Sequence, residues 1–248
     1  MYYLLRKKKT NLKSIAVILL LLTASPRLFS QNVELNLPDH DNKKYYLGIA
    51  LMYVSSGLRV SHHPSFLGQD TIQVIDPKNT AGLGLAGLHT FTLSQHFEVR
   101  AVFPQLLFAT KSLIYNVKYP DPAQEETAIM TKNVESIVAG AGLHLKFRSD
   151  RINNFAFYIF GGGKIDYDAS SNSGARRAEN LVKLKKFDYG VEGGIGFNFY
   201  FPVFILSPEL KISNGLSNSH SRDQNLKFSS TIDKLNTRMI LFSLIFEG

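Results

Sequence analysis

The sequence predicts an all-β protein: an eight-stranded antiparallel transmembrane β-barrel with long extracellular loops and short periplasmic turns. Residues 186–201, KFDYGVEGGIGFNFYF, alternate between bulky apolar side chains and small or polar ones. This alternation is typical of a strand with two unlike faces. The run is also much longer than an ordinary strand, as a tilted strand that crosses a bilayer must be. The connections between the predicted strands alternate between long and short, which favours a barrel in an outer membrane.

Composition narrows the class of protein. Hydrophobic residues make up 44% of the 248 residues, which is low for a helical membrane protein and compatible with a barrel. The net charge is +8, but residues 1–30 contain six of the 28 basic side chains and no acid, so the remainder carries only +2. A nucleic-acid partner therefore has little support. The absence of Cys excludes disulfides, thiolate metal sites and a lipid anchor on Cys.

The first 30 residues predict a secretory signal peptide, with cleavage after Ser30. Arg6–Lys9 form a basic start, and Ile15–Leu22 form an apolar stretch that is too short to span a bilayer as a helix. An uncleaved anchor helix is the alternative. Residues 31–44 then form a polar periplasmic lead, and residues 45–248 form the barrel.

The first four predicted strands each have a local signal. The first opens with Tyr45 and Tyr46, as expected of an aromatic belt at the membrane interface. The second is rich in Gly, and the third contains Pro104, which predicts a bulge because proline cannot donate to a ladder. The fourth alternates throughout. These strands span residues 45–56, 80–92, 96–117 and 133–147, and residues 57–79 between the first two are expected to form a long loop.

The last four predicted strands continue the alternation. Pro202 closes a tight turn between the sixth and the seventh, and the eighth ends in the aromatic Phe246, which resembles the insertion signal of outer-membrane barrels. The strands span residues 154–167, 186–201, 203–213 and 236–247. A soluble eight-stranded barrel remains the structural alternative, with the bulky apolar face turned inward.

The small and polar face of each strand predicts a lumen filled by side chains, because an eight-stranded barrel has no open pore. Both signs of charge occur on this face, so the side chains can form a neutralising network or, alternatively, a path for protons or solutes. Counting from the Pro202 turn places Glu192 near Lys211, and we expect these two to pair. The candidate lumen charges are Glu98, Arg100, Lys146, Lys164, Asp166, Glu192, Glu209 and Lys211.

Motifs that would indicate catalysis or a cofactor are weak. Gly82–Gly87 formally matches G-x-G-x-x-G, and Gly161–Gly163 is glycine-rich, but neither precedes a predicted helix. The loop residues His62, His63, Asp70, His220 and Asp223 match no strong metal or catalytic spacing. We therefore expect no catalytic residue, no metal and no cofactor, with a barrel enzyme as the remaining alternative.

Several segments resemble the PorT family of the Bacteroidetes. The similarity covers most of residues 31–248, and its most specific parts are Asn36–Pro38, the GLGLAG stretch, Arg100–Pro104 and Leu113–Tyr115. The resemblance implies an outer-membrane barrel of the type IX secretion system, linked also to gliding motility, without catalytic residues. It implies outer-membrane lipid and other secretion components as partners. A generic barrel that acts as scaffold or adhesin is the alternative function.

Overall fold

The computed structural model describes residues 34–64, 72–120, 127–170, 184–221 and 231–248. The chain divides into two units, Met1–Glu34 and Leu35–Gly248, and the second contains every element described below. The predicted signal peptide and its cleavage point after Ser30 lie outside the described residues, as do Asp70 and Asp223. Within the described residues, no helix is long and apolar enough to cross a bilayer.

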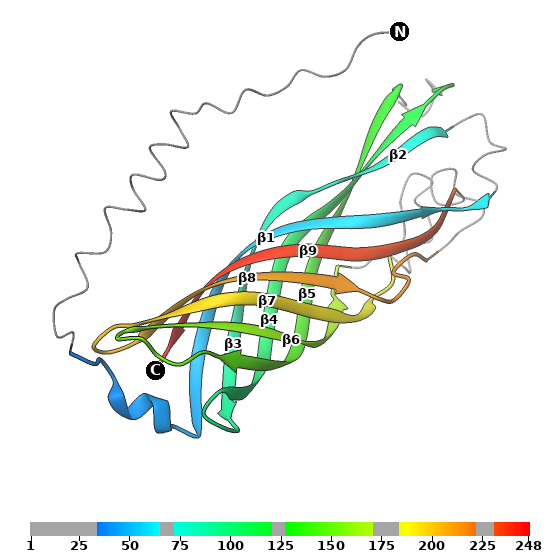
Figure 1. The fold of residues 1–248 in the computed structure, drawn as a ribbon. Coiled ribbons are helices and arrows are strands. Elements are labelled where there is room, and N and C mark those ends of the chain that lie inside the picture. Colours follow the sequence, from blue (N-terminus) through cyan, green and yellow to red (C-terminus); the bar gives the residue numbers. More distant parts are fainter. Residues whose placement is uncertain (1–33, 65–71, 121–126, 171–183, 222–230) are drawn as a thin grey trace, which may run out of the picture. The chain divides into compact units, whose positions relative to one another are not determined.

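The structure is built almost entirely of long antiparallel strands (Figure 1). The sequence prediction of an all-β fold is confirmed, and most strand ends agree with it to within a few residues. A short 3-10 helix, Pro38–Asn42, precedes the strands. The strands are β1 (Tyr45–His62), β2 (Ile72–Lys78), β3 (Thr80–Thr92), β4 (Phe97–Val117), β5 (Ile129–Arg148), β6 (Phe155–Asp168), β7 (Phe187–Tyr200), β8 (Ile205–Gly215) and β9 (Ile232–Glu247).

Eight of these strands close into a ring. Their neighbours follow the order β4-β3-β1-β9-β8-β7-β6-β5, and β5 pairs back with β4 along most of its length. Because the last strand of the sheet pairs with the first, the barrel has no free lateral edge over this stretch. The C-terminal Gly248 donates its backbone N–H to Leu47 O, so the chain ends beside the beginning of β1.

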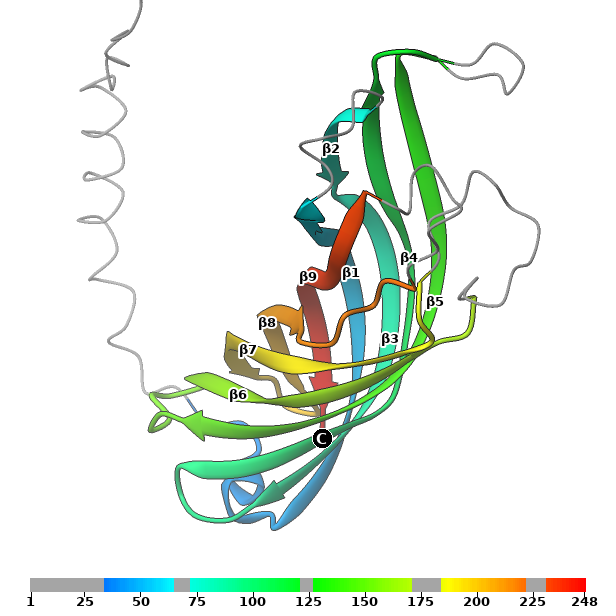
Figure 2. The ribbon, with the colours of Figure 1, turned by 90° about the vertical axis from the view of Figure 1, so that its right-hand side faces the viewer.

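The first long connection differs from the sequence prediction. Residues 57–79 were expected to be loop, but β1 continues to His62 and β2 occupies Ile72–Lys78. β2 pairs with the upper part of β4, beyond the point where β3 begins, so β2 and β3 occupy one position in the ring in succession. Figure 2 shows the strands curving together, with β4 and β5 extending past β6 and β7 at the loop end. Strands of unequal length therefore give the barrel a taller wall on one side.

The register of the sheet contains one irregularity that the sequence predicted. The pairing of β4 with β5 shifts between Val102 and Gln105, and its pairing with β3 shifts between Ala86 and Leu88. Both shifts lie at Pro104, which has no N–H to offer to a ladder. An irregularity of the ladder, a bulge or a local break, was expected at this proline and is confirmed as a shift of register.

The two faces of the barrel have opposite chemistry, and the apolar one is outside. In β7 the buried side chains are those of the small and polar set, while Phe187, Ile195 and Phe199 are exposed. The inverted, soluble arrangement is therefore wrong. One detail of the prediction also fails, because Tyr45 faces outward but Tyr46 is buried, as strict alternation requires.

Aromatic side chains gather on the outer face at both ends of the strands. At the turn end Tyr45 contacts Phe91, and Phe201 stacks with Phe204, with ring centroids 4.9 and 5.0 Å apart. At the loop end Tyr167 and Phe187 lie 5.0 Å apart. Two aromatic girdles around an aliphatic band are characteristic of transmembrane barrels.

The outward face predicts a steep penalty for charge. Ile195 is exposed near the middle of β7, and we expect Ile195→Lys to lower the free energy of unfolding by about 2–4 kcal/mol, because the ammonium would lie at mid-bilayer depth. Urea unfolding in lipid vesicles measures this loss. The matched control is Val203→Lys in the exposed turn before β8, where the cost should stay below about 1 kcal/mol near the interface. Equal losses for the two variants would contradict the membrane position of β7.

Candidate functional site in the barrel interior

All eight candidate lumen charges are buried inside the ring of strands. None of these residues exposes more than 5% of its surface. They come from β4, β5, β6, β7 and β8, and each lies on the face opposite to the apolar band. The residues are Glu98, Arg100, Lys146, Lys164, Asp166, Glu192, Glu209 and Lys211.

Arg100 connects opposite walls of the barrel. It lies on β4, and its Nη1 donates to Glu209 Oε2 on β8 at 2.7 Å, while its Nη2 donates to Glu247 Oε1 on β9 at 3.1 Å. β4 and β8 are four positions apart in the eight-membered ring, so this fork spans the full width of the lumen. Tyr158 on β6 also donates to Glu209 Oε2, at 2.8 Å. One guanidinium thus forms ion pairs with two carboxylates that have left water.

A second ion pair lies beside the first, on neighbouring strands. Lys146 Nζ is 3.0 Å from Glu98 Oε2, and these residues face each other in the β4–β5 register. Tyr46 of β1 donates to the same carboxylate oxygen at 3.0 Å. Lys146 Nζ also lies 4.2 Å from the ring centroid of Tyr158, and Arg100 Cζ lies 5.2 Å from the same centroid. The tyrosine therefore joins the two ion pairs into one layer.

Glu192 is the centre of a third group, nearer to the loop end. Lys211 Nζ donates to Glu192 Oε2 at 3.0 Å, so the two residues expected to pair lie in direct contact. His144 Nε2 is 2.8 Å from the same oxygen. Lys164 and Asp166, on one face of β6, form a separate pair at 2.6 Å. Every candidate charge thus has a partner of opposite sign.

Several polar side chains of the barrel interior were not among the candidates predicted from the sequence. Glu247 follows from the alternation of the last strand, since it is inward like Ser243 and Ile245, but it was not counted. Lys111 pairs with Asp168 at 3.2 Å. Lys111 lies beyond the Pro104 irregularity and Asp168 lies at the end of β6, where the register could not be predicted from the sequence. Asp188 accepts hydrogen bonds from Ser217 and Thr237. His144 and Tyr158 were assigned no role, because a polar side chain in a lumen does not reveal its partner.

The interior also contains apolar layers that the sequence analysis did not expect. At the loop end, inward side chains from β1, β2, β4, β5 and β9 form a buried cluster, and Leu184 joins them. Three of its members, Leu58, Ile72 and Ile75, come from the extension of β1 and from β2, which were predicted to be loop. The cluster comprises Leu58, Ile72, Ile75, Leu113, Tyr115, Val117, Val134, Leu184, Ile232 and Leu235.

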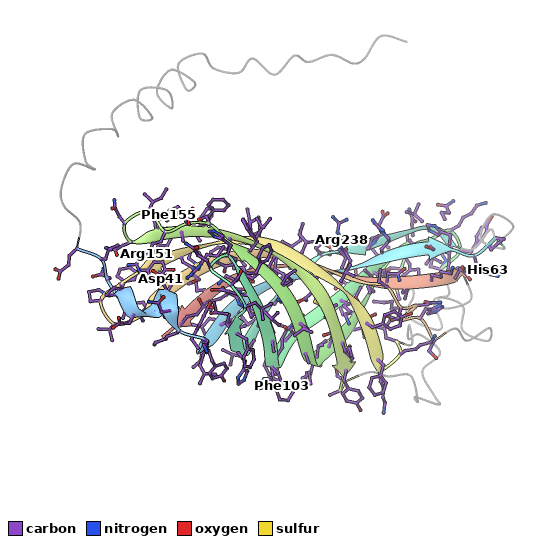
Figure 3. All side chains as sticks on the ribbon, turned by 60° about the horizontal axis from the view of Figure 1, so that its bottom comes forward. Asp41, His63, Phe103, Arg151, Phe155 and Arg238 are labelled. Carbon is purple, nitrogen blue, oxygen red and sulfur yellow. The ribbon has the colours of Figure 1, made fainter. Side chains whose placement is uncertain are left out.

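The polar lead covers the turn end of the barrel. Asp41 accepts ion pairs from Arg148 at 3.2 Å and from Arg151 at 3.4 Å, and Figure 3 shows Asp41 and Arg151 at this end. Arg151 also donates to Asn36 O and lies over the ring of Tyr200, with its guanidinium carbon 3.8 Å from the centroid. Residues 36–42 are therefore held at the turn-end opening of the barrel by several contacts.

His40 is the residue by which the lead enters the mouth. Its ring is buried and lies 4.6 Å from Tyr46 and 6.2 Å from Tyr200, measured between centroids. Neither ring nitrogen has a hydrogen-bond partner in the described part of the chain. Burial lowers the pKa of His40 below its usual range, since the imidazolium would lose its hydration.

Three histidines that were predicted to lie in loops, His62, His63 and His220, belong to the described residues. Among the described residues no group of three or more His, Cys, Asp and Glu side chains could hold a metal ion. His62 and His63 stand at the end of β1, at the loop end labelled by His63 in Figure 3, while His220 is buried beside Leu184. Asp70 and Asp223, which the sequence analysis grouped with them, lie outside the described residues.

Removal of Arg100 is expected to destabilise the barrel strongly. Arg100→Leu leaves Glu209 and Glu247 buried without their cation, which should cost about 3–5 kcal/mol of unfolding free energy at pH 7. Urea titration in lipid vesicles provides the measurement. Lys186→Leu serves as the control, because Lys186 is exposed and changes the net charge equally. Addition of Glu209→Gln and Glu247→Gln to Arg100→Leu should recover part of the loss, and no recovery would argue against charge as its cause.

The His40 pKa predicts that acid loosens the lead. Below the ordinary histidine pKa of about 6.5, an undocked lead binds a proton that the docked ring excludes, so docking weakens as pH falls. Hydrogen exchange of the His40 and Lys43 amides, which bond to Leu37 O and His40 O, reports docking once intrinsic rates are corrected. Protection should fall between pH 7.5 and 5.5 in the wild type. The same fall in His40→Phe would rule out this histidine as the cause.

Several solved protein structures are similar to this chain at low sequence identity. Neisserial surface protein A is 9% identical, with a TM-score of 0.42 over 83% of this chain and 96% of that one. OprG from Pseudomonas aeruginosa is 14% identical, with a TM-score of 0.41 over 82% and 93%. Ail of Yersinia pestis is 12% identical, with a TM-score of 0.37 over 83% and 100%. No curated protein sequence matches the chain.

The family is established by the sequence itself. Residues 29–221, well over half of the chain, match the family described as "Outer membrane protein beta-barrel domain". The closed ring, the outward apolar band and the charged interior agree with that description. The chain belongs to the outer-membrane β-barrel domain family and is a protein of the outer membrane.

Proposed function

We propose that this protein is a PorT-like component of the type IX protein secretion system, without enzymatic activity. The observation that carries the proposal is the resemblance of Asn36–Pro38, Gly82–Gly87, Arg100–Pro104 and Leu113–Tyr115 to the PorT family. The resemblance implies a role in the export of proteins with C-terminal secretion signals, and a link to gliding motility.

Two of these segments carry residues with a structural role in the barrel. Asn36 is bonded to the turn-end mouth, where its backbone N–H donates to Asn154 Oδ1 at 2.9 Å and its side chain donates to Tyr200 O at 2.9 Å. Arg100 joins β4 to β8 and β9. Asn36 therefore helps to cover the turn-end opening of the barrel, and Arg100 supplies positive charge to its interior.

The packed interior indicates how such a component would act. Ion pairs cross the lumen, apolar side chains fill its loop end, and residues 36–42 cover its turn end. An exported polypeptide has no room in an eight-stranded barrel filled in this way. We therefore propose that the protein acts through its outer surface and its two rims, in contact with outer-membrane lipid and with other secretion components.

Deletion of the gene tests the proposal. Proteins with C-terminal secretion signals should disappear from the culture medium and accumulate in the periplasm, as measured by quantitative proteomics of both fractions, and gliding should be lost where the organism glides. Expression of the wild-type chain should restore both. Normal secretion and motility in the deletion strain would contradict the proposal and leave the scaffold or adhesin role.

Complementation separates this role from an enzyme in the loops. Because no catalysis is proposed, His62→Ala/His63→Ala should restore secretion as fully as the wild type does. Failure of this variant at normal barrel abundance, with heat-modifiable gel mobility retained, would favour a loop site over the proposed role.

A further inference from the structure

A cleft opens in the barrel wall where β1 loses one of its neighbours. β1 pairs with β3 only as far as Ser56, because β3 begins at Thr80, and β2 pairs with β4 alone. From Gly57 onward, β1 is paired only on its β9 side within the described residues. The result is a cleft of about 530 Å³, lined by Ser55, Gly57, Leu58, Arg59, Val60, His62, Ile75, Pro77, Asn79, Arg238 and Ile240.

Two arginines lie on the outer side of this cleft, and the part of the chain that the structure describes supplies no counter-charge to them. Arg59 on β1 and Arg238 on β9 are exposed, and the register pairs Gly57 with Arg238, which makes Arg59 its diagonal neighbour. Lys234 lies farther along the same face of β9, beyond Asn236. Within the described residues, none of these three cations forms an ion pair, although Asp76 and Asp233 are on adjacent segments. Like charges on neighbouring strands repel each other, so an anion bound between them would stabilise this region.

Glycine at position 57 leaves room for the Asn79 side chain beside the arginines. The side chain of Asn79 occupies the space that a Cβ on Gly57 would need, so only glycine leaves room there without displacing it. The amide of Asn79 thereby reaches the wall of the cleft, close to the register position of Arg238. Guanidinium groups and an amide are donors that suit phosphate oxygens.

An apolar groove continues directly from the cleft toward the middle of the membrane. It has a volume of about 550 Å³ and is lined by Leu51, Met52, Tyr53, Leu83, Gly84, Leu85, Phe108, Phe242 and Leu244. Ser55 faces Ile240 in the cleft, and the next outward pair, Tyr53 and Phe242, lines the groove. A cationic pocket and an apolar channel thus follow each other along one face of β1 and β9.

We propose that this composite surface binds one phosphorylated glycolipid of the outer leaflet, with a phosphate on Arg59 and Arg238 and an acyl chain in the groove. The cleft lies at the end of the barrel that carries the long connections, which in outer-membrane barrels is the extracellular end. Its depth in the bilayer is that of the headgroups, and the groove reaches into the hydrocarbon below. Figure 3 shows Arg238 on the outer side of the sheet.

The experiment measures lipid binding by the full-length purified protein. Native mass spectrometry in detergent is used to titrate lipid A, which carries phosphates and acyl chains, and to compare it with phosphatidylcholine, deacylated lipid A and inorganic phosphate. Loss of one charge-assisted contact weakens binding about tenfold. Arg59→Ala/Arg238→Ala should therefore weaken lipid A binding by at least about tenfold.

A matched variant controls for net charge. Lys185 and Lys186 are exposed at the start of β7, two ring positions beyond β9, and Lys185→Ala/Lys186→Ala removes the same charge at the same end of the barrel. This variant should bind lipid A as the wild type does. An equal loss in both double variants would overturn the proposal, because it would indicate a diffuse attraction to anions.

The ligands test the two halves of the site separately. Deacylated lipid A and inorganic phosphate should each bind at least about tenfold more weakly than lipid A, since neither fills the groove. Equal binding of either would reduce the site to a phosphate pocket and overturn the lipid assignment. Phosphatidylcholine bound as tightly as lipid A would also overturn it. An acidic extended peptide that binds beside β1 in place of lipid A would assign the cleft to a protein partner instead.

Discussion

Neutralisation of charge inside a closed ring is the constraint on which this structure depends. Arg100, Lys146 and Lys211 cannot leave the lumen, because the outer face of every strand meets hydrocarbon. Each buried charge is expensive unless a partner of opposite sign lies in contact with it. The fork from Arg100 to Glu209 and Glu247 therefore does more than join two strands. It fixes the position of β4 relative to β8 and β9, and it can form only if the closed barrel has a diameter that brings Arg100 within reach of both carboxylates.

The outer face is governed by the opposite requirement. Side chains there must be apolar through the hydrocarbon and aromatic near the two interfaces. The described chain meets this condition along most of the wall and departs from it at Arg59 and Arg238. That departure occurs where β1 has lost β3 as a neighbour and where the cleft lined by Gly57 and Asn79 opens. The charged side chains and the break in strand pairing thus occur at the same place on the wall, and the proposed lipid site lies there.

The interior and the lead together make the barrel a closed body. Apolar side chains fill the loop end, ion pairs and a second apolar cluster fill the middle, and Asn36 and Asp41 are bonded to the turn end. Such a protein offers partners its rims and its lipid-facing wall. A role in secretion proposed on the PorT resemblance therefore concerns assembly and contact within the membrane, and the lumen contributes by keeping that body rigid.

The sequence by itself determined the central part of each of the eight barrel strands and which face of each strand meets lipid. Period-two alternation is a local property, so Ile195 could be placed outward, Glu192 inward and Pro104 at a bulge without knowledge of the fold. It also brought Glu192 and Lys211 together, because one short turn links their strands. The tertiary structure decided everything that joins distant strands. Only ring closure sets Arg100 beside Glu209 and Glu247, extends β1 past Ser56, and places β2 so that a cleft opens. These contacts depend on the relative stagger of strands far apart in the chain, which no local pattern encodes.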